Sequence, residues 1–506
     1  MEKYEKLHQY VKKFNAQDEE FIKQSFSNEQ AYSWLKENIP LLDCPNKEIE
    51  ETYYFRWWVY RKHIKQTPEG YIITEFLPEV YWAGAYNSIN CAAGHHLYEG
   101  RWLRKGNTYL EDYIRFWLKG SGDVRSYSTW IADAVYQYCL VKGDFKIAIE
   151  LLPKLMQNYE KWEEEHQHES GLFWSIDDRD AMEYSISGNG LRPTLNSYLY
   201  ADASAIAKIA DMAGDLSYKK YEDKSKSIKQ LVQEKLWDKK AKFFKVIPLE
   251  TKESKVQNWN FEELDLEQNV REEIGLIPWY FHLPDRGYEE AWKQLLDSQG
   301  FAAPYGPTTA ERRHPRFKFE QKDHECLWNG PSWPFATTQT LTAMANVLKD
   351  YSQDFITKED FYRIFSSYTH AHYRVNEQGV RINWLDEDLD ADTGEWISRK
   401  ILKEWGWKAK KGGYERGKDY NHSAYADLII SKIFGIEPKE NGEIYVRPML
   451  PEKWEYCRLQ DVSCQGKNIS IVFDKTGEIY HQGQGYQIWC DGVCMHQSLN
   501  PQDVIL

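Results

Sequence analysis

The stretch SYLYADASAIAKIADMAGD, residues 197–215, carries the apolar spacing of an amphipathic helix and ends on Gly214-Asp215. Its apolar side chains recur at i, i+3, i+4 and i+7, which places them on one helical face: Leu199, Ala203, Ile206, Ile209, Ala210 and Ala213. Small Ala and Ser residues allow neighbouring helices to approach closely, and the final Gly-Asp is typical of a helix C-cap. We therefore predict a buried, tightly packed helix here.

Two further stretches repeat this design. Residues 129–144, TWIADAVYQYCLVKGD, also end on Gly-Asp, and residues 333–351, WPFATTQTLTAMANVLKDY, show the same spacing. From about residue 85 to 435, helical segments alternate with loops that contain glycine or proline. This alternation predicts a mainly α fold, in which paired helices form a toroid or solenoid over residues 81–435.

The two ends of the chain have a different residue pattern from the helical part. Residues 1–80 are mixed: residues 53–64 have a helical pattern and residues 69–78 resemble a strand, so we expect a segment that packs on the helical body. After residue 436, short β-type runs alternate with turn residues: GEIYVRPMLP, KNISIVFDK, EIYHQG and YQIWCDGV. We predict a small antiparallel β module over residues 436–506.

Composition narrows the possible functions. The net charge of −14 argues against nucleic acid or an anionic membrane as the main partner. Aromatic residues make up 15% of the chain, which suits packed cores and stacking on sugar rings. No secretory signal or membrane span is visible, and the eight cysteines are scattered, so a reducing, cytoplasmic location without a structural metal is expected. The oligomeric state is not predicted.

Three polar loops stand out from this helical background. The first, residues 173–200, combines four carboxylates with two arginines and aromatic neighbours: Asp177, Asp178, Asp180, Glu183, Arg179, Arg192, Phe173, Trp174, Tyr184 and Tyr198. The second is DHECLWNGPSWPF, residues 323–335, and the third is DEDLDADTGEW, residues 386–396. Loops between paired helices gather at one rim of a toroid, so these three are expected to meet there.

Each loop has an ordinary explanation as well. Carboxylates beside arginines often form surface ion pairs, and the Trp-rich loop could be a packed corner. Alternating acids in residues 386–392 could hold a cation, although the spacing is not that of an EF-hand. Taken together, two separated carboxylates in an aromatic pocket are what glycoside cleavage requires, one as a protonated acid and one as an ionised base.

The third loop carries a resemblance to a known family, the six-hairpin (α/α)6 glycosidases and especially glycoside hydrolase family 63. The base loop of that family reads E-x-Y-N-P-x-T-G, and here Glu387 and Thr393-Gly394 stand in the same register, with Leu389, Asp390 and Ala391 at the three intervening family positions. The resemblance implies an (α/α)6 toroid in which Glu387 is the general base.

The first loop resembles the acid segment of the same family. Local alignment on L-D-D points to Asp177 as the acid, whereas counting back from Leu195-Asn196 points to Asp180, and both stay open. The resemblance implies a place in the sugar pocket for Trp82, Trp328, Asn329, Gly330 and Trp333. Further candidates for substrate binding, taken from the loops themselves, are Tyr86, Asn87, Trp174, Glu183, Arg192 and Trp384. Where the family has Trp-Asp, this chain has Trp82-Ala83, which removes a typical contact to a glucose hydroxyl.

The expected function is therefore an inverting glycosidase that acts on α-linked oligosaccharides or small α-glycosides, without a cofactor or metal. Its two carboxyl groups should lie roughly 6.5–9.5 Å apart. Two enzymes on the same toroid are alternatives: a phosphorylase, with Arg312, Arg313 and His314 as its phosphate site, and an epimerase of the N-acylglucosamine type, with His95-His96 and His422 transferring protons. A glycan-binding module without activity is a third alternative.

Overall fold

The structure, a computed structural model, describes residues 3–319 and 323–506. Its helices are α1 (Glu5–Ala16), α2 (Ala31–Asn38), α3 (Lys47–His63), α4 (Ala93–Gly100), α5 (Asn107–Leu118), α6 (Ile131–Lys142), α7 (Lys146–His166), α8 (Pro193–Met212), α9 (Tyr218–Leu231), α10 (Lys293–Leu296), α11 (Pro334–Asp350), α12 (Lys358–His370), α13 (Ile397–Glu404) and α14 (Tyr425–Asp427), with the 3₁₀ helix η5 (Glu273–Phe281) and the π-helical turn η8 (Leu428–Ile433). In the described ranges, no helix combines the length and apolarity that a membrane crossing requires.

The strands are short before residue 450 and longer after it. They are β1 (Leu41–Asp43), β2 (Ile64–Thr67), β3 (Gly70–Ile73), β4 (Trp174–Ser175), β5 (Gly190–Leu191), β6 (Trp237–Asp238), β7 (Phe243–Phe244), β8 (Ile247–Pro248), β9 (Tyr373–Val375), β10 (Arg381–Asn383), β11 (Ile436–Pro438), β12 (Ile444–Val446), β13 (Tyr456–Cys464), β14 (Lys467–Asp474), β15 (Gly485–Cys490), β16 (Val493–Ser498) and β17 (Val504–Ile505). The chain is thus helical in its body and β-rich at its end, as predicted.

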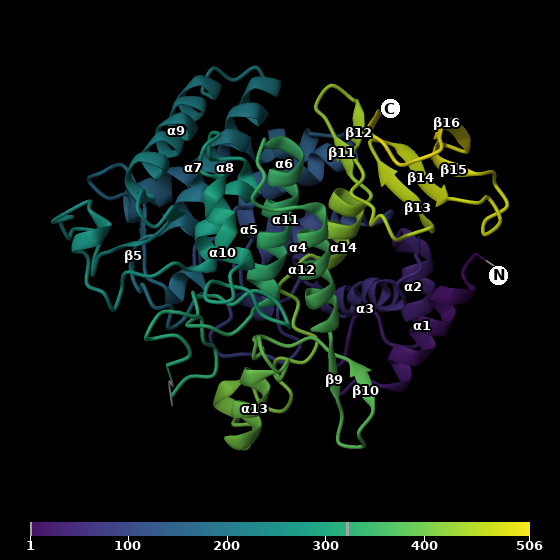
Figure 1. Cartoon of the computed structure of the whole chain (residues 1–506), viewed down its shortest axis with the longest axis horizontal. Coiled ribbons are helices and arrows are strands. Elements are labelled where there is room, and N and C mark those ends of the chain that lie inside the picture. Colours follow the sequence, from purple (N-terminus) through teal and green to yellow (C-terminus); the bar gives the residue numbers. More distant parts are fainter. Residues whose placement is uncertain (1–2, 320–322) are drawn as a thin grey trace.

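The helices pack as a closed ring. Within it α4 contacts α6, α6 contacts α8, α8 contacts η5 and η5 contacts α11, while η8 and α14 complete the circle back to α4. Outer helices cover this ring, with α7 and α9 on α8, α12 on α11 and α3 on α14 (Figure 1). This arrangement confirms the predicted toroid of helical hairpins.

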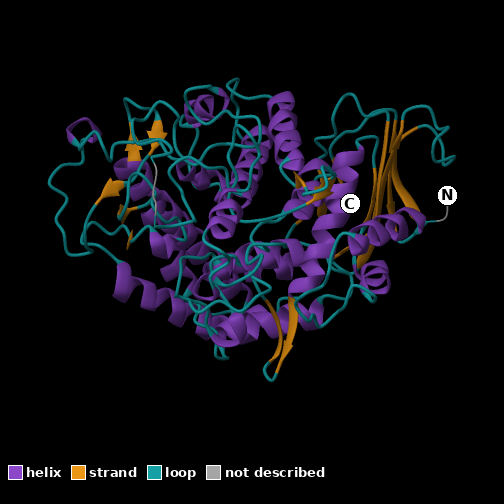
Figure 2. Ribbon diagram, turned by 90° about the horizontal axis from the view of Figure 1, so that it is seen from below, coloured by secondary structure: helices purple, strands orange, loops and turns teal. Residues whose placement is uncertain are grey.

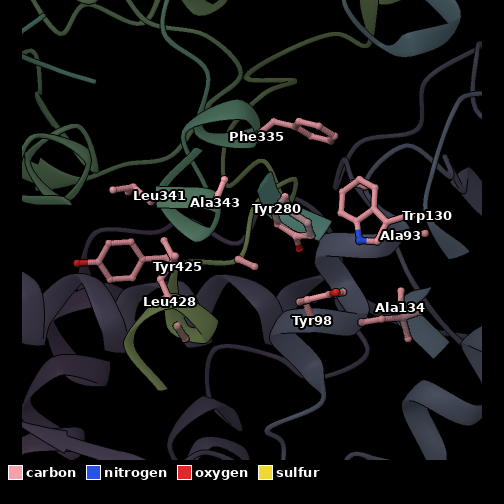
Figure 3. Close-up of a cluster of buried hydrophobic side chains, with 14 of the residues drawn as sticks. Ala93, Tyr98, Trp130, Ala134, Tyr280, Phe335, Leu341, Ala343, Tyr425 and Leu428 are labelled. Atoms are coloured by element: carbon pink, nitrogen blue, oxygen red, sulfur yellow. The ribbon is translucent and has the colours of Figure 1, made fainter. Parts of the chain in front are cut away.

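The ring closes tightly because its inner helices are rich in small and aromatic side chains. α8 begins at Pro193, which suits a first helical turn, and it buries Ala203 and Ala210 of the predicted face, whereas Ala213 caps the helix and is exposed. Trp130, which precedes α6, packs against Tyr198 of α8 and Tyr280 of η5, with ring centroids 4.8 and 5.8 Å apart. Figure 3 shows Trp130, Tyr280 and Phe335 converging from separate inner elements. Each buried ring of this size contributes roughly 1.5–3 kcal/mol.

The C-terminal sheet incorporates a strand from the other end of the chain. Its order is β1-β13-β14-β15-β16, so residues 41–43 pair with β13. Figure 2 shows a sheet of strands beside the helical body. The expected strand in residues 478–483 is wrong, because the Asp474 carboxylate accepts the backbone N–H groups of Gly477, Ile479 and Tyr480 and closes a turn there. The domain limits of 1–80, 81–435 and 436–506 stay a prediction.

Glu273, at the start of η5, makes stability depend on pH. It is 1% exposed, its Oε1 accepts the Thr340 hydroxyl at 2.8 Å, and burial raises its pKa to about 8. Since the folded pKa lies above the unfolded value, the stabilisation is complete below about pH 4.5 and is lost as pH rises through 8. We expect Glu273→Gln, compared with the parent, to gain about 3 °C in Tm between pH 5.5 and 8.5 by calorimetry. A constant Tm difference would contradict the assignment.

Candidate functional site

A cavity of about 310 Å³ opens at the end of the ring where helix-connecting loops gather. Six loops line it: those after β3, before α6, around residues 178–183, before α11, after β10 and before α14. The lining residues are Glu75, Phe76, Tyr81, Trp82, Ile89, Cys91, Tyr127, Asp178, Arg179, Ala181, Glu183, His324, Glu325, Cys326, Trp333, Glu387, Lys411, Arg416 and Tyr420. The three loops that the sequence singled out therefore do meet.

Backbone hydrogen bonds hold these loops to one another. The loop before α11 pairs with the acidic loop through Ser332 and Leu389, whose N–H and C=O groups bond in both directions at 2.9 and 3.0 Å. The Trp328 N–H donates to the carbonyl of Glu183 at 3.0 Å, and the Asn421 N–H donates to the carbonyl of Glu75 at 3.0 Å. The side chains are consequently presented on a fixed frame, as a preorganised site requires.

Glu387 lies at the base of the cavity, and it is only 1% exposed. Its Oε1 accepts the Nε–H of Arg416 at 2.8 Å and a second bond from Nη2, so a buried cation neutralises the carboxylate. Gly417 lets the backbone bring Arg416 close to Glu387. Any other residue at position 417 would place its Cβ 1.9 Å from Oδ1 of Asp386, the residue before Glu387. The guanidinium and the carboxylate thus form a buried, charge-assisted hydrogen-bonded pair.

Glu183 lies in the wall of the same cavity and has the opposite character. Burial of its carboxyl group, together with the negative charges of Asp178, Glu387 and Asp177, raises its pKa to about 8. Glu75, on another wall, accepts the hydroxyl of Tyr420, and burial raises its pKa to about 7. The cavity thus holds a carboxyl group that keeps its proton near neutral pH, Glu183, and a carboxylate that is paired with arginine, Glu387. Acid–base catalysis needs such a pair, one group to donate a proton and one to accept a proton.

The remaining charges of the cavity form a connected network. Arg416 also donates to Oε1 of Glu325 at 2.5 Å, and the Lys411 ammonium bonds Oε2 of Glu325 at 2.8 Å. Arg179 lies at the exposed mouth, with its guanidinium 5.2 Å from the centre of the Tyr127 ring. The cationic side chains inside the cavity therefore already have carboxylate partners.

Aromatic side chains make up much of the rest of the wall. Trp333 stacks on Trp328 with ring centroids 4.8 Å apart, and Trp82 lies 5.3 Å from the guanidinium of Arg416. Tyr81 is 78% exposed at the rim. Flat apolar faces beside polar groups suit the hydrated ring of a saccharide, which presents C–H faces and hydroxyl edges.

The two sequence candidates for the acid lie outside this lining. Asp180 is fully buried, its Oδ2 accepts Nε–H of Arg192 at 2.7 Å, and Ser128 and Thr194 donate to it as well. Asp177 is half-buried and accepts the backbone N–H of Asp178 and the hydroxyl of Ser185. Both carboxylates thus hold the shape of the loop that presents Glu183 to the cavity.

Most of the predicted substrate-binding residues support the loops and do not line the cavity. Asn87 bonds the backbone of residues 76–80, Tyr86 bonds Glu69, Trp174 bonds the Leu249 carbonyl, and Arg192 holds Asp180. The side-chain amide of Asn329 donates to the Phe319 carbonyl, and Trp384 donates to Asp386. Gly330 adopts φ +150° beside Phe317. Of the predicted binding set, Trp82, Glu183 and Trp333 line the cavity, with Trp328 stacked behind Trp333.

The aspartates that follow Glu387 each have a hydrogen-bond or ion-pair partner. Asp388 accepts the Ser398 hydroxyl, Asp390 bonds Lys318, and Asp392 pairs with Lys318 and Arg312. Throughout the described ranges, no group of three or more His, Cys, Asp or Glu side chains is placed to hold a metal ion. These residues therefore pin the loop that carries Glu387.

The residues on which the alternative functions depend lie elsewhere. His95, His96 and His422 are about 1% exposed or less, and burial lowers the pKa of each, so they are neutral core histidines outside the cavity lining. Arg312 pairs with Asp392 and Arg313 with Asp297, while the His314 ring bonds the Leu266 carbonyl. Neither an exposed histidine pair nor a converging phosphate site is present among these residues.

A second cavity, of about 980 Å³, opens at the opposite end of the inner helices beneath the β11–β12 hairpin. Several of its charged groups are joined in pairs, such as Lys208 with Glu440 and Arg447 with Asp350. Asp133, which lines it, accepts the Tyr98 hydroxyl. Size alone would favour this cavity, but the combination of a protonated and an ionised carboxyl group favours the smaller one.

Several lining residues were missed by the sequence analysis, above all Glu75, Cys326 and Arg416. Glu75 lies inside the expected strand of residues 69–78 without a recognisable motif, and Arg416 lies in the Gly- and Lys-rich stretch KKGGYERGKDY. The glycines that flank Arg416 were a usable signal, since they permit a close approach of the backbone. Cys326 lies within the Trp-rich loop of residues 323–335, but no distinctive spacing marks it.

Comparison with known proteins gives a consistent result. Residues 85–423 match the family model of the mannosylglycerate hydrolase MGH1-like glycoside hydrolase domain. A solved structure described as a sialidase is 38% identical with a TM-score of 0.90; the match covers 99% of this chain but 44% of that one, so this chain spans less than half of its length.

More distant structures share the fold. The family 63 mannosylglycerate hydrolase from Thermus thermophilus, in complex with Tris and D-glycerate, is 12% identical with a TM-score of 0.50, over 74% of this chain and 98% of that one. A family 78 rhamnosidase from a Bacillus species is 11% identical with a TM-score of 0.50, over 86% and 40%. At such low identity the likeness concerns the architecture alone.

Proposed function

The chain belongs to the family of mannosylglycerate hydrolase MGH1-like glycoside hydrolases, and on this premise we propose that it hydrolyses α-glycosides with inversion of configuration. The observation that carries the proposal is the pairing, in one aromatic cavity, of Glu183 with a pKa near 8 and Glu387 bound by Arg416. A cavity of about 310 Å³ accommodates one sugar ring and part of an aglycone.

In the proposed mechanism, Glu183 donates its proton to the glycosidic oxygen while the C–O bond breaks. Glu387 takes a proton from water, and that water attacks the anomeric carbon from the opposite face. The product sugar has the inverted anomeric configuration, and solvent then returns a proton to Glu183 and removes one from Glu387. The proposal therefore moves the acid from Asp177 or Asp180 to Glu183 and keeps Glu387 as the base.

A screen of 4-nitrophenyl α- and β-glycosides, α-linked disaccharides and glycosyl glycerates tests this function. For the best substrate, ¹H NMR of the first-formed product should show the anomer opposite to that of the substrate. Retention of configuration, or phosphate-dependent turnover, would remove the inverting hydrolase. An aryl α-sialoside belongs in the same screen, because the similar structure is described as a sialidase and Arg179 lies at the mouth.

The pH profile should carry the signature of Glu183. The acid works only while it is protonated, so we expect kcat/KM to fall as pH rises through about 8. This alkaline limb of the kcat/KM profile reports the pKa of Glu183 in the free enzyme. Asp178→Asn removes a negative charge that raises the pKa of Glu183, so its alkaline limb should move to lower pH. The profiles of both proteins, measured on one substrate at constant ionic strength, check this. An alkaline limb that stays in place in the variant would contradict the role of Glu183.

A further inference from the structure

Cys326 contacts the proposed base directly. Its thiol donates to Oε2 of Glu387 at 2.7 Å, whereas Arg416 donates to the other oxygen, Oε1, at 2.8 Å. Each oxygen of the carboxylate therefore has a different donor. The two donors come from separate loops, one before α11 and one before α14.

The loop holds this thiol in a defined place. The Cys326 N–H donates to Nδ1 of His324 at 3.1 Å, and the Ser398 hydroxyl of α13 donates to the Glu325 carbonyl at 3.0 Å. Burial raises the pKa of the Cys326 thiol, and the negative charge of Glu387 raises it further, so the sulfur keeps its proton and remains a donor.

We propose that Cys326 is a positioning residue for Glu387, a role that rests on the proposed function of Glu387 as the base. Arg416 anchors Oε1 alone, so the plane of the carboxylate can still pivot about that oxygen, and the thiol at Oε2 removes this freedom. A thiol is a weak donor, so Oε2 keeps most of its basicity toward water. The pair of donors thus fixes the direction of the base and leaves Oε2 able to accept a proton from water.

The contact can be tested without any substrate. Iodoacetamide labels the intact protein between pH 7 and 10, and peptide mass spectrometry follows Cys326, with the exposed Cys494 as an internal control. Because the charge of Glu387 raises the thiol pKa, Glu387→Gln should move the labelling midpoint of Cys326 downward by about one pH unit or more and leave Cys494 unchanged. An unchanged Cys326 midpoint overturns the contact.

Kinetics test the positioning role on the substrate that the screen identifies. We expect Cys326→Ala to lower kcat about 10- to 100-fold with little change in KM or Tm, and Cys326→Ser, which restores a donor, to recover most of the loss. The matched control Cys494→Ser should match the parent.

Three outcomes overturn the proposal: unaltered kcat in Cys326→Ala, equal losses in the Ala and Ser variants, or a sugar covalently attached to Cys326. Failure of the proposed function gives a different result from failure of the positioning role. If Glu387 is not the base, Glu387→Gln retains turnover, whether or not the labelling midpoint of Cys326 shifts.

Discussion

Glu183→Gln is expected to lower kcat by about 10²- to 10⁴-fold on a glycoside with an alcohol leaving group, because the departing oxygen then leaves without a proton. On the corresponding α-glycosyl fluoride the loss should nearly disappear, since fluoride departs as an anion and needs no acid. The measurement is kcat for parent and variant on both substrates. An equal loss on both would contradict the role of Glu183 as the acid.

Glu387→Gln provides the contrast. Both substrates require an activated water, so this variant should lose about 10²- to 10⁴-fold on each of them. Asp177→Asn is the matched control on the acid loop, because Asp177 bonds the backbone of its own turn and does not line the cavity. Its kcat should stay within about tenfold of the parent. If Asp177→Asn lowered kcat on the glycoside with the alcohol leaving group but not on the glycosyl fluoride, Asp177 would be the acid.

The fold was predictable because the helical repeat is visible in the chain. Residues 197–215 alternate small and apolar residues at helical spacing, and the structure places residues 197–212 in α8, one of the inner helices of the ring. The pairing of β1 with β13 was not predictable, because strands separated by about 400 residues give no local signal of their partnership. Turn chemistry also outweighed β propensity at residues 478–483, where one carboxylate, Asp474, accepts three backbone donors.

The site was predictable to the level of its loops. The spacing of the motif identified Glu387 as the candidate base. It could not choose the acid among the four carboxylates of residues 177–183, because the exposure and direction of each side chain decide its chemistry. Asp180 faces Arg192 in the core, whereas Glu183 faces the cavity, where burial raises its pKa to about 8. Arg416 and Cys326 approach Glu387 from loops 29 and 61 residues away in sequence, and only the folded chain brings these side chains together.

The second large effect concerns stability at Asp180. Its carboxylate and the guanidinium of Arg192 both have 0% side-chain exposure, so Asp180→Ala leaves a buried cation without its partner. The cost of breaking such a pair is about 3–5 kcal/mol, which for a chain of this length lowers Tm by about 3–5 °C. Calorimetry of the variant beside the parent measures this directly.

The same variant separates a structural carboxylate from a catalytic one. Arg192 also donates to Ser185 and to the Gly188 carbonyl, so the loop that presents Glu183 loosens when Asp180 is removed. We expect part of the activity of Asp180→Ala to return at lower temperature, where the folded loop is favoured, and the alkaline limb near pH 8 to persist because Glu183 still supplies the proton. A variant with the parent's Tm and a glycosyl fluoride activity that far exceeds its activity on an alcohol leaving group would instead make Asp180 the acid, and Glu183 would then lose that role.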